Sequence, residues 1–318
     1  MKIVITARNF STGDDNAVRL LQAAGHEIID LSDADMGAGT PESAVWEAVQ
    51  DAEIAIAGLE PYSRTVLEHC PDLRLISRRG IGYDSVDLDA CIDHKVTVCR
   101  TVGAVEGSVA EHVLAYILYF ARRVDLQNIP MHEGKWQRVM TPGAKTRKLG
   151  LVGFGGIGKE IALRARPFGM ELYYTCRHPN SAWEKEYGVK YLPMDELLAT
   201  CDYVSANVPL TESTKNMFDA AAFAKMKPGS IFINIARGPV ADAHALRAAL
   251  DSGHLAGAAI DVFDREPCTD SPLIGQPNAL LTPHTASYTS ENFTAMNIIA
   301  AQNVLDFLDG RLDDKFLV

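Results

Sequence analysis

The segment LVGFGGIGKEIALRA (151–165) decides how this chain folds. It ends a strand-like apolar run and opens a helical one, and Gly153, Gly155 and Gly158 match the pattern G-x-G-x-x-G. In such a loop the first glycine permits a tight turn and the second lets the main chain approach a pyrophosphate. The third allows the helix to pack closely on the strand. The segment therefore predicts a dinucleotide-binding loop within a parallel α/β sheet.

Alternating strand and helix patterns extend from this loop in both directions. Five strand-like runs precede it, at 2–7, 26–30, 53–58, 73–78 and 95–99, and a second series follows from residue 148 onward. Such alternation predicts mostly parallel sheets covered by helices. A length of 318 residues exceeds what one core usually fills. We therefore predict an α/β fold with two doubly wound parallel-sheet domains.

Three helix boundaries can be predicted from local signals. Ser108 followed by Glu111 fits a capping box, so a helix is expected over 109–123. That run is too short to cross a bilayer, which needs about 20 apolar residues. Asp242 is expected to cap another helix, and Gly310 to end the last one.

Composition and charge exclude several kinds of partner. The net charge of −11 argues against nucleic-acid and anionic-membrane binding, because both need a basic surface. The six cysteines have no metal-like spacing, so neither a metal site nor a disulfide framework is expected. The N-terminal run MKIVITARNF lacks the features of a secretory signal. A reduced, cytoplasmic protein is expected.

Three ionisable residues near the end of the chain suggest redox chemistry on a 2-oxo acid. Arg237, Glu266 and His284 each follow an apolar, β-rich run. Parallel sheets present their chemistry at the carboxyl ends of strands. An arginine can hold a carboxylate, a histidine can donate a proton, and a glutamate can hold the charged imidazole.

The strand after the glycine loop bears on the choice of cofactor. Enzymes that use NAD usually end this strand with an acid that binds the ribose 2′-hydroxyl. Here the run ELYYTCRHPN (171–180) has Cys176 at that position, followed by Arg177 and His178. A cation without a neighbouring acid would attract a 2′-phosphate, so NADP is favoured and NAD is the alternative.

Ordered motifs along nearly the whole chain resemble those of the D-isomer-specific 2-hydroxyacid dehydrogenase family. They are RRGIGYDSVDLDAC (78–91), SVAEH (108–112), the glycine loop, VPLTEST (208–214), NIARGPVAD (234–242), DVFDREP (261–267) and LTPHTAS (281–287). The resemblance implies a Rossmann cofactor domain, 101–287, inserted into a flavodoxin-like substrate domain, 1–100 plus 288–318. It also implies an active site in the cleft between the domains, and a homodimer.

The resemblance assigns a role to each matching position. Arg237 would grip the substrate carboxylate and polarise the carbonyl, His284 would be the acid/base, and Glu266 would orient His284 and raise its pKa. The substrate carboxylate would also meet Arg79, Gly80, Ile81 and Gly82. Asp261 would hold the nicotinamide carboxamide. The remaining cofactor contacts would be Gly153, Phe154, Gly155, Gly156, Ile157, Gly158, Cys176, Arg177, His178, Val208, Pro209, Thr214 and Ala236.

The expected activity is reduction of a small 2-oxo acid of the glyoxylate or hydroxypyruvate type. Arg78 and Arg79 could instead reach a phosphate, which leaves D-3-phosphoglycerate dehydrogenase as an alternative. Glu60 and Tyr62 are expected to face the ligand, where an acid would disfavour a phosphate. A nucleotide-sensing binding protein on the same fold is the non-enzymatic alternative. Arg100 stands where many relatives have asparagine, and its role is open.

Overall fold

The computed structural model describes residues 1–318 as two compact units, each built on one parallel sheet. The first unit comprises Met1–Val105 with Tyr288–Val318, and the second comprises Glu106–Ser287. Every paired strand in both sheets runs parallel to its neighbour. The predicted α/β class, with two doubly wound parallel sheets, is confirmed.

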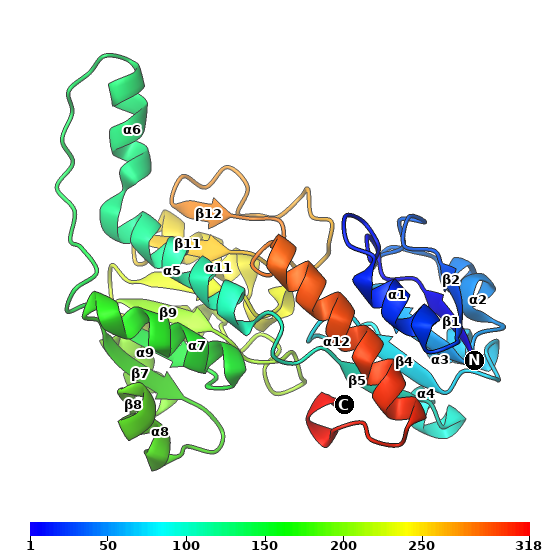
Figure 1. Ribbon diagram of the computed structural model, residues 1–318. Coiled ribbons are helices and arrows are strands. Elements are labelled where there is room, and N and C mark those ends of the chain that lie inside the picture. The colour runs from blue at the N-terminus through cyan, green and yellow to red at the C-terminus, as the bar shows by residue number, and fades with distance from the viewer. The chain divides into compact units, whose positions relative to one another are not determined.

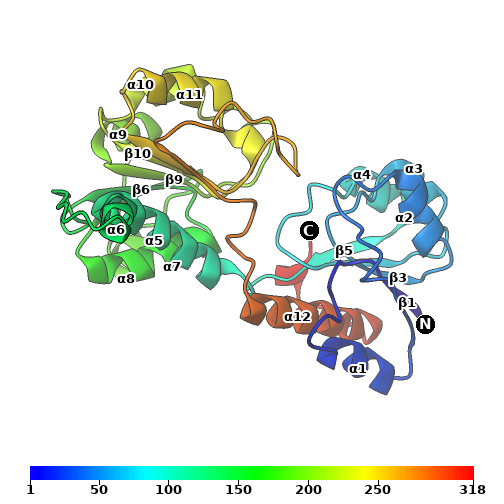
Figure 2. The same cartoon turned by 90° about the horizontal axis from the view of Figure 1, so that it is seen from above.

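The first unit has a five-stranded sheet in the order β2-β1-β3-β4-β5, which is the flavodoxin-like order. Its strands are β1 (Lys2–Ile5), β2 (Glu27–Asp30), β3 (Ile54–Ala57), β4 (Leu75–Arg78) and β5 (Thr97–Arg100). Helices cover both faces, as Figure 2 shows. On one face lie α1 (Asn16–Ala23) and α12 (Ser290–Leu308), and on the other α2 (Glu42–Val49), α3 (Arg64–Glu68) and α4 (Leu88–His94). A short 3-10 helix, η3 (Asp314–Phe316), closes the chain.

The second unit has a seven-stranded sheet in the order β12-β11-β10-β9-β6-β7-β8, which contains the Rossmann order around β6. The strands are β6 (Lys148–Val152), β7 (Glu171–Thr175), β8 (Val189–Tyr191), β9 (Tyr203–Ala206), β10 (Ile231–Asn234), β11 (Gly257–Ile260) and β12 (Ala279–Leu281). The glycine loop follows the central strand β6. This is the point at which the strand order reverses, where such sheets bind ligands.

Helices also cover both faces of the second sheet (Figure 2). One face carries α5 (Glu106–Arg122), α7 (Gly156–Ala165) and α8 (Ser181–Tyr187), and the other α9 (Met194–Thr200), α10 (Ala220–Lys225) and α11 (Ala243–Asp251). The short helices η1 (Arg166–Phe168) and η2 (Gly238–Val240) complete the unit. In Figure 1, α6 (Val124–His132) and the segment after it reach away from this sheet.

The central strands are buried along their whole length. Every residue of β3, β4, β9, β10 and β11 is buried. Helices on both faces explain why these strands are mostly apolar and do not alternate between apolar and polar residues. The backbone can leave the core only at the strand ends, and the loops there present polar side chains.

Two of the three predicted helix boundaries are confirmed, and one is wrong. The Asp242 carboxylate accepts from the N–H groups of His244 and Ala245, and Gly310 follows α12 with a left-handed φ of +67°. However, α5 begins at Glu106, so Ser108 lies in its first turn instead of capping it. A Ser-x-x-Glu spacing also fits inside a helix, and the acid at Glu106 favours an earlier start through the helix dipole. No helix is both long and apolar enough to cross a bilayer.

Candidate active site

The glycine loop has the geometry that its sequence predicts. Gly153 has a φ of +95°, and a Cβ on it would lie 2.7 Å from the carbonyl oxygen of Asn207. A Cβ on Gly158 would lie 2.6 Å from the carbonyl oxygen of Gly153. At Gly155, by contrast, a Cβ would meet nothing within 4 Å. Packing therefore requires the first and third glycines, whereas the second leaves open space at the N-terminus of α7, where N–H groups favour an anion.

Two other predicted cofactor positions have structural tasks of their own. The Phe154 ring turns into the core, with its centroid 4.7 Å from that of Tyr174. The Thr214 hydroxyl donates to the carbonyl oxygen of Pro209 at 2.6 Å. The neighbouring Val208 would be 3.0 Å from a Cβ on Gly153, so this segment lies directly against the glycine loop.

The end of β7 exposes a cation. The N–H of Gly153 donates to the carbonyl oxygen of Thr175 at 2.9 Å, which joins the two loops. Cys176 is half-buried, whereas Arg177 and His178 are exposed. No carboxylate of the chain pairs with Arg177. Cys176 thus occupies the position of the usual ribose-binding acid, and the guanidinium of Arg177, which follows it, has no carboxylate partner.

His284 and Glu266 form a direct pair. The Nδ1 atom of His284 lies 2.6 Å from Oε2 of Glu266, and their side chains are 33% and 28% exposed. The N–H of Phe263 donates to the other carboxylate oxygen at 3.0 Å. Burial alone would raise the pKa of Glu266, but the His284 hydrogen bond and charge outweigh it and leave that pKa lowered. The carboxylate is therefore ionised and directed at the imidazole, whose Nε2 is left for another partner.

Arg237 follows β10 and lies near this pair. Its Nη1 donates to the carbonyl oxygen of Ala236 at 2.7 Å, and its positive charge helps to lower the pKa of Glu266. A Cβ on Gly238 would collide with the main chain of Phe263. Only glycine fits there, and this close approach brings the segment after β10 against the segment after β11. The three residues selected from the sequence therefore share one edge of the second sheet.

In the first unit, the loop after β4 has free backbone donors. Gly80 has a φ of +138°, and its N–H donates to the Thr101 hydroxyl at 2.9 Å. The next two N–H groups, of Ile81 and Gly82, have no acceptor in the chain. Such a pair of donors suits a carboxylate oxygen.

Arg79, beside that loop, is held by main chain and by α12. Its Nη2 donates to the carbonyl oxygen of Arg8 at 2.7 Å, and its guanidinium lies 4.8 Å from the centroid of the Phe293 ring. Burial lowers its pKa to about 10. These contacts fix the end of β4 to α12 within the first unit.

The expectation that Glu60 and Tyr62 face the ligand is wrong. Both side chains are 0% exposed. The Glu60 carboxylate accepts from the Thr6 hydroxyl and from the N–H of Gly58, and the Tyr62 hydroxyl lies 3.2 Å from the Thr6 hydroxyl. Donors within the core draw this acid inward, although it follows a strand end as the others do.

Sequence reasoning missed a polar chain beside the site. His112 and Tyr116 on α5 contact each other and Thr282, whose hydroxyl donates to Asp261 at 2.5 Å. The signal was available, since His112 and Tyr116 are four residues apart and therefore adjacent on one side of a mostly apolar helix.

All six cysteines are free thiols, and no group of three or more His, Cys, Asp or Glu side chains could hold a metal ion.

Comparisons with known proteins converge on one family. Residues 114–286 match the family described as "D-isomer specific 2-hydroxyacid dehydrogenase, NAD binding domain". A glyoxylate reductase of Korarchaeum cryptofilum is 36% identical over 84% of this chain and 83% of its own length. A glyoxylate/hydroxypyruvate reductase B of Klebsiella pneumoniae is 37% identical over 84% and 85%. The TT0316 protein of Thermus thermophilus superposes over the full length of both chains with a TM-score of 0.86 and 31% identity.

Proposed function

Because this chain belongs to the D-isomer specific 2-hydroxyacid dehydrogenase family and is an NAD(P)-dependent oxidoreductase, we propose that it reduces a small 2-oxo acid of the glyoxylate or hydroxypyruvate type. The observation that carries the proposal is the 2.6 Å contact between His284 and Glu266, with Arg237 close enough to lower the pKa of that acid. The names of the relatives support the choice of substrates.

The side chains divide the chemistry among them. A reduced nicotinamide cofactor, when bound, would supply the hydride that C2 of the 2-oxo acid accepts. The Arg237 guanidinium holds the substrate carboxylate and stabilises the negative charge that develops on the carbonyl oxygen. The Nε2–H of the imidazolium of His284 gives its proton to that oxygen, and Glu266 keeps the ring oriented through Nδ1. Oxidation of the hydroxy acid runs these steps in reverse.

The two units divide the binding. We assign the cofactor to the second unit, at the glycine loop and the N-terminus of α7, and Asp261 to the nicotinamide side of that site. Within the first unit, the free N–H groups of Ile81 and Gly82 are the proposed donors to a carboxylate. The six free thiols are in keeping with a reducing, cytoplasmic location.

NADP is the proposed cofactor, because Arg177 is an exposed cation without an acid partner. Its guanidinium would pair with a 2′-phosphate. We expect the ratio of kcat/KM for NADPH over NADH to exceed 1, and to fall about tenfold or more in Arg177→Ala. Lys190→Ala, which removes an exposed cation from β8, is the matched control and leaves the ratio unchanged. A wild-type enzyme that prefers NADH would refute this assignment.

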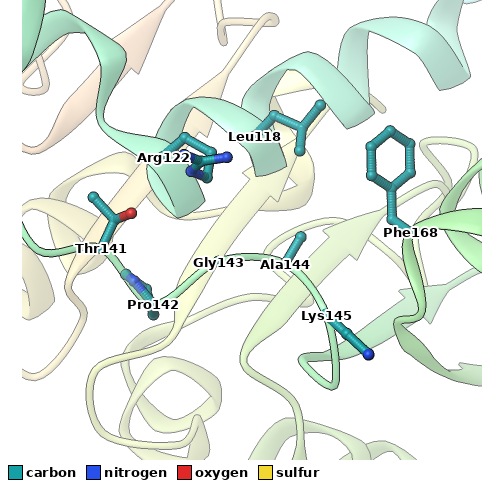
Figure 3. A pocket seen from close by; sticks show the side chains of 8 residues that line it. All are labelled: Leu118, Arg122, Thr141, Pro142, Gly143, Ala144, Lys145 and Phe168. Carbon is teal, nitrogen blue, oxygen red and sulfur yellow. The ribbon is translucent and has the colours of Figure 1, made fainter.

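We propose that the protein is a homodimer, and that the segment 124–140, which begins with α6, forms the interface. No residue of α6 is buried, and six large apolar side chains within 124–140 are exposed: Val124, Leu126, Ile129, Met131, Trp136 and Met140. At the base of this segment lies a pocket of about 380 Å³, with Leu118, Arg122 and Phe168 among its lining residues (Figure 3). A second copy would cover such a surface symmetrically.

The oligomeric state can be tested with one double variant. We expect wild-type protein to sediment as a dimer and Ile129→Ser/Met131→Ser as a monomer. Ile274→Ser removes a comparably exposed apolar side chain elsewhere in the second unit and serves as the control. A wild-type monomer, or a variant that remains dimeric, would remove α6 from the interface.

The activity is tested with a panel of 2-oxo acids and both reduced cofactors. Glyoxylate and hydroxypyruvate should be reduced, and His284→Ala should lose activity about 1,000-fold while it still binds cofactor. Full turnover by that variant would overturn the acid/base assignment. The panel includes 3-phosphohydroxypyruvate, because the burial of Glu60 removes the acid that was expected to repel a phosphate. D-3-phosphoglycerate dehydrogenase is therefore the second candidate.

A further inference from the structure

The carboxylate of Asp261 is committed to the loop that carries His284. Asp261 is 1% exposed. Its Oδ1 accepts from the Thr282 hydroxyl at 2.5 Å and from the N–H of Thr285 at 2.8 Å, and its Oδ2 accepts from the N–H of Ala286 at 2.9 Å. These donors flank His284 on both sides. A buried carboxylate is stable when such hydrogen bonds replace its lost hydration.

The main chain of His284 is itself held by the same residue. Its N–H donates to the carbonyl oxygen of Asp261 at 2.7 Å, and its φ is +53°. Residues other than glycine adopt this left-handed region at a cost, so surrounding contacts must maintain it. Asp261 supplies those contacts through both its backbone and its side chain.

We propose that Asp261 is a positioning residue for His284, and that Thr282, Tyr116 and His112 extend this support to α5. The inference rests on the proposed function, in which His284 transfers the proton. The carboxylate holds the residues before and after His284, so the loop keeps the imidazole on Glu266. A hydrogen bond from the nicotinamide carboxamide to Asp261 would come in addition to those that the carboxylate already accepts from Thr282, Thr285 and Ala286.

Hydrogen-bond direction fixes the protonation along the chain of contacts. An ionised carboxylate only accepts, so the single proton of Thr282 points at Asp261. The Thr282 oxygen must then accept from the Tyr116 hydroxyl, and the Tyr116 oxygen must accept from Nε2–H of His112 at 2.8 Å. Burial raises the pKa of Tyr116, which keeps that hydroxyl protonated. The structure thus assigns His112 a proton on Nε2.

Thr282 gives the sharpest test, because its hydroxyl can be removed at nearly constant volume. In Thr282→Val, we expect kcat with hydroxypyruvate to fall about 10-fold or more, because a small misplacement of a reacting group has effects of that size. Thr282→Ser keeps the hydroxyl, so its kcat with hydroxypyruvate should lie within about threefold of the wild-type value. The dissociation constant of the reduced cofactor should stay unchanged in both variants.

A cofactor analogue separates positioning of His284 from binding of the carboxamide. The 3-acetylpyridine analogue lacks the amide N–H₂ that would donate to Asp261. Under the proposal, Thr282→Val loses the same factor in kcat with the analogue as with the natural cofactor. A loss that disappears with the analogue would mean that Asp261 acts through the nicotinamide alone, and would overturn the proposal.

The remaining outcomes are also decisive. Wild-type kcat in Thr282→Val would overturn the proposal, while activity in His284→Ala would instead remove the proposed function beneath it. If Thr282→Val does not fold, Tyr116→Phe decides, because it keeps the ring and removes only the hydroxyl. We expect about a threefold loss of kcat there with an unchanged cofactor dissociation constant. In that case, unchanged kcat in Tyr116→Phe would overturn the whole proposal; if Thr282→Val folds, it would refute only the extension to α5.

Discussion

Two glutamates that follow strands of parallel sheets have opposite environments in this protein. Glu60 follows β3 in the first unit and is 0% exposed. Glu266 follows β11 in the second unit, and its side chain is 28% exposed. The partners of Glu60 are a hydroxyl and a backbone N–H, whereas Glu266 contacts an imidazole.

The difference teaches that a place at a strand end does not make an acid functional. Glu60 binds neutral donors that cannot change charge near neutral pH, so its hydrogen bonds serve the core. Glu266 binds a group that can take up and release a proton, and both members of that pair reach solvent. The partner and the access to solvent therefore separate the proposed active-site acid, Glu266, from the structural one, Glu60.

The largest expected effect is on catalysis, in Glu266→Gln. The amide keeps the shape of the side chain but removes the charge that supports a protonated His284. We expect kcat/KM with hydroxypyruvate to fall about 100-fold, and the free energy of unfolding to change by less than about 1 kcal/mol. Steady-state kinetics and urea unfolding measure the two quantities. A variant that keeps full activity would place Glu266 in the same structural class as Glu60.

Glu60→Ala should give the opposite result. It leaves the Gly58 N–H without an acceptor inside the core, and it leaves the Thr6 hydroxyl only its longer contacts with the Ile56 carbonyl oxygen and the Tyr62 hydroxyl. We expect the free energy of unfolding to fall by about 3 kcal/mol, while kcat of the folded enzyme stays within about threefold of wild type. Urea unfolding, followed by assays under native conditions, tests both parts. A large loss of kcat without a loss of stability would mean that Glu60 acts on the substrate.

For the second unit, the sequence predicted both the glycine loop and the grouping of the three ionisable residues. The G-x-G-x-x-G spacing constrains the backbone so tightly that the pattern alone assigns Gly153 and Gly158 their roles. Arg237, Glu266 and His284 could be grouped because each follows an apolar run, and parallel strands end at one edge of the sheet. Alternation of strands and helices predicted the α/β class for the same physical reason.

What the sequence could not show is the direction in which a side chain turns. Glu60 lies in a strand-end loop like Glu266, and one of the two donors that hold it inward, the Thr6 hydroxyl, comes from a distant part of the chain. The support of Asp261 by Thr282 and Tyr116 joins segments more than 100 residues apart, so no local pattern contains it. The start of α5 was missed because a capping-box spacing also occurs within helices.

The pH dependence of stability sharpens the contrast further. The pKa of Glu266 in the folded protein is lowered from an ordinary value of 4.5, so the unfolded chain binds this proton more readily. The ionised Glu266 carboxylate therefore stabilises the fold above pH 4.5 and loses that contribution as pH falls through its lowered pKa. We expect the difference in unfolding free energy between wild type and Glu266→Gln to shrink on acidification. A difference that grows at low pH would contradict the direction of the pKa change.

The smallest expected effect concerns two buried tyrosines, one in each unit. Tyr62 contacts the Thr6 hydroxyl beside Glu60, and Tyr116 contacts the Thr282 hydroxyl beside Asp261. Tyr62→Phe should cost about 0.5 to 1 kcal/mol of unfolding free energy and leave kcat unchanged, because one neutral hydrogen bond is lost from the core. Tyr116→Phe removes the same hydroxyl from a network that ends at His284, so its loss should register in kcat. If Tyr62→Phe and Tyr116→Phe change both the unfolding free energy and kcat by the same amounts, the two hydroxyls have the same role. The distinction between Glu60 and Glu266 would then not extend to the residues around them.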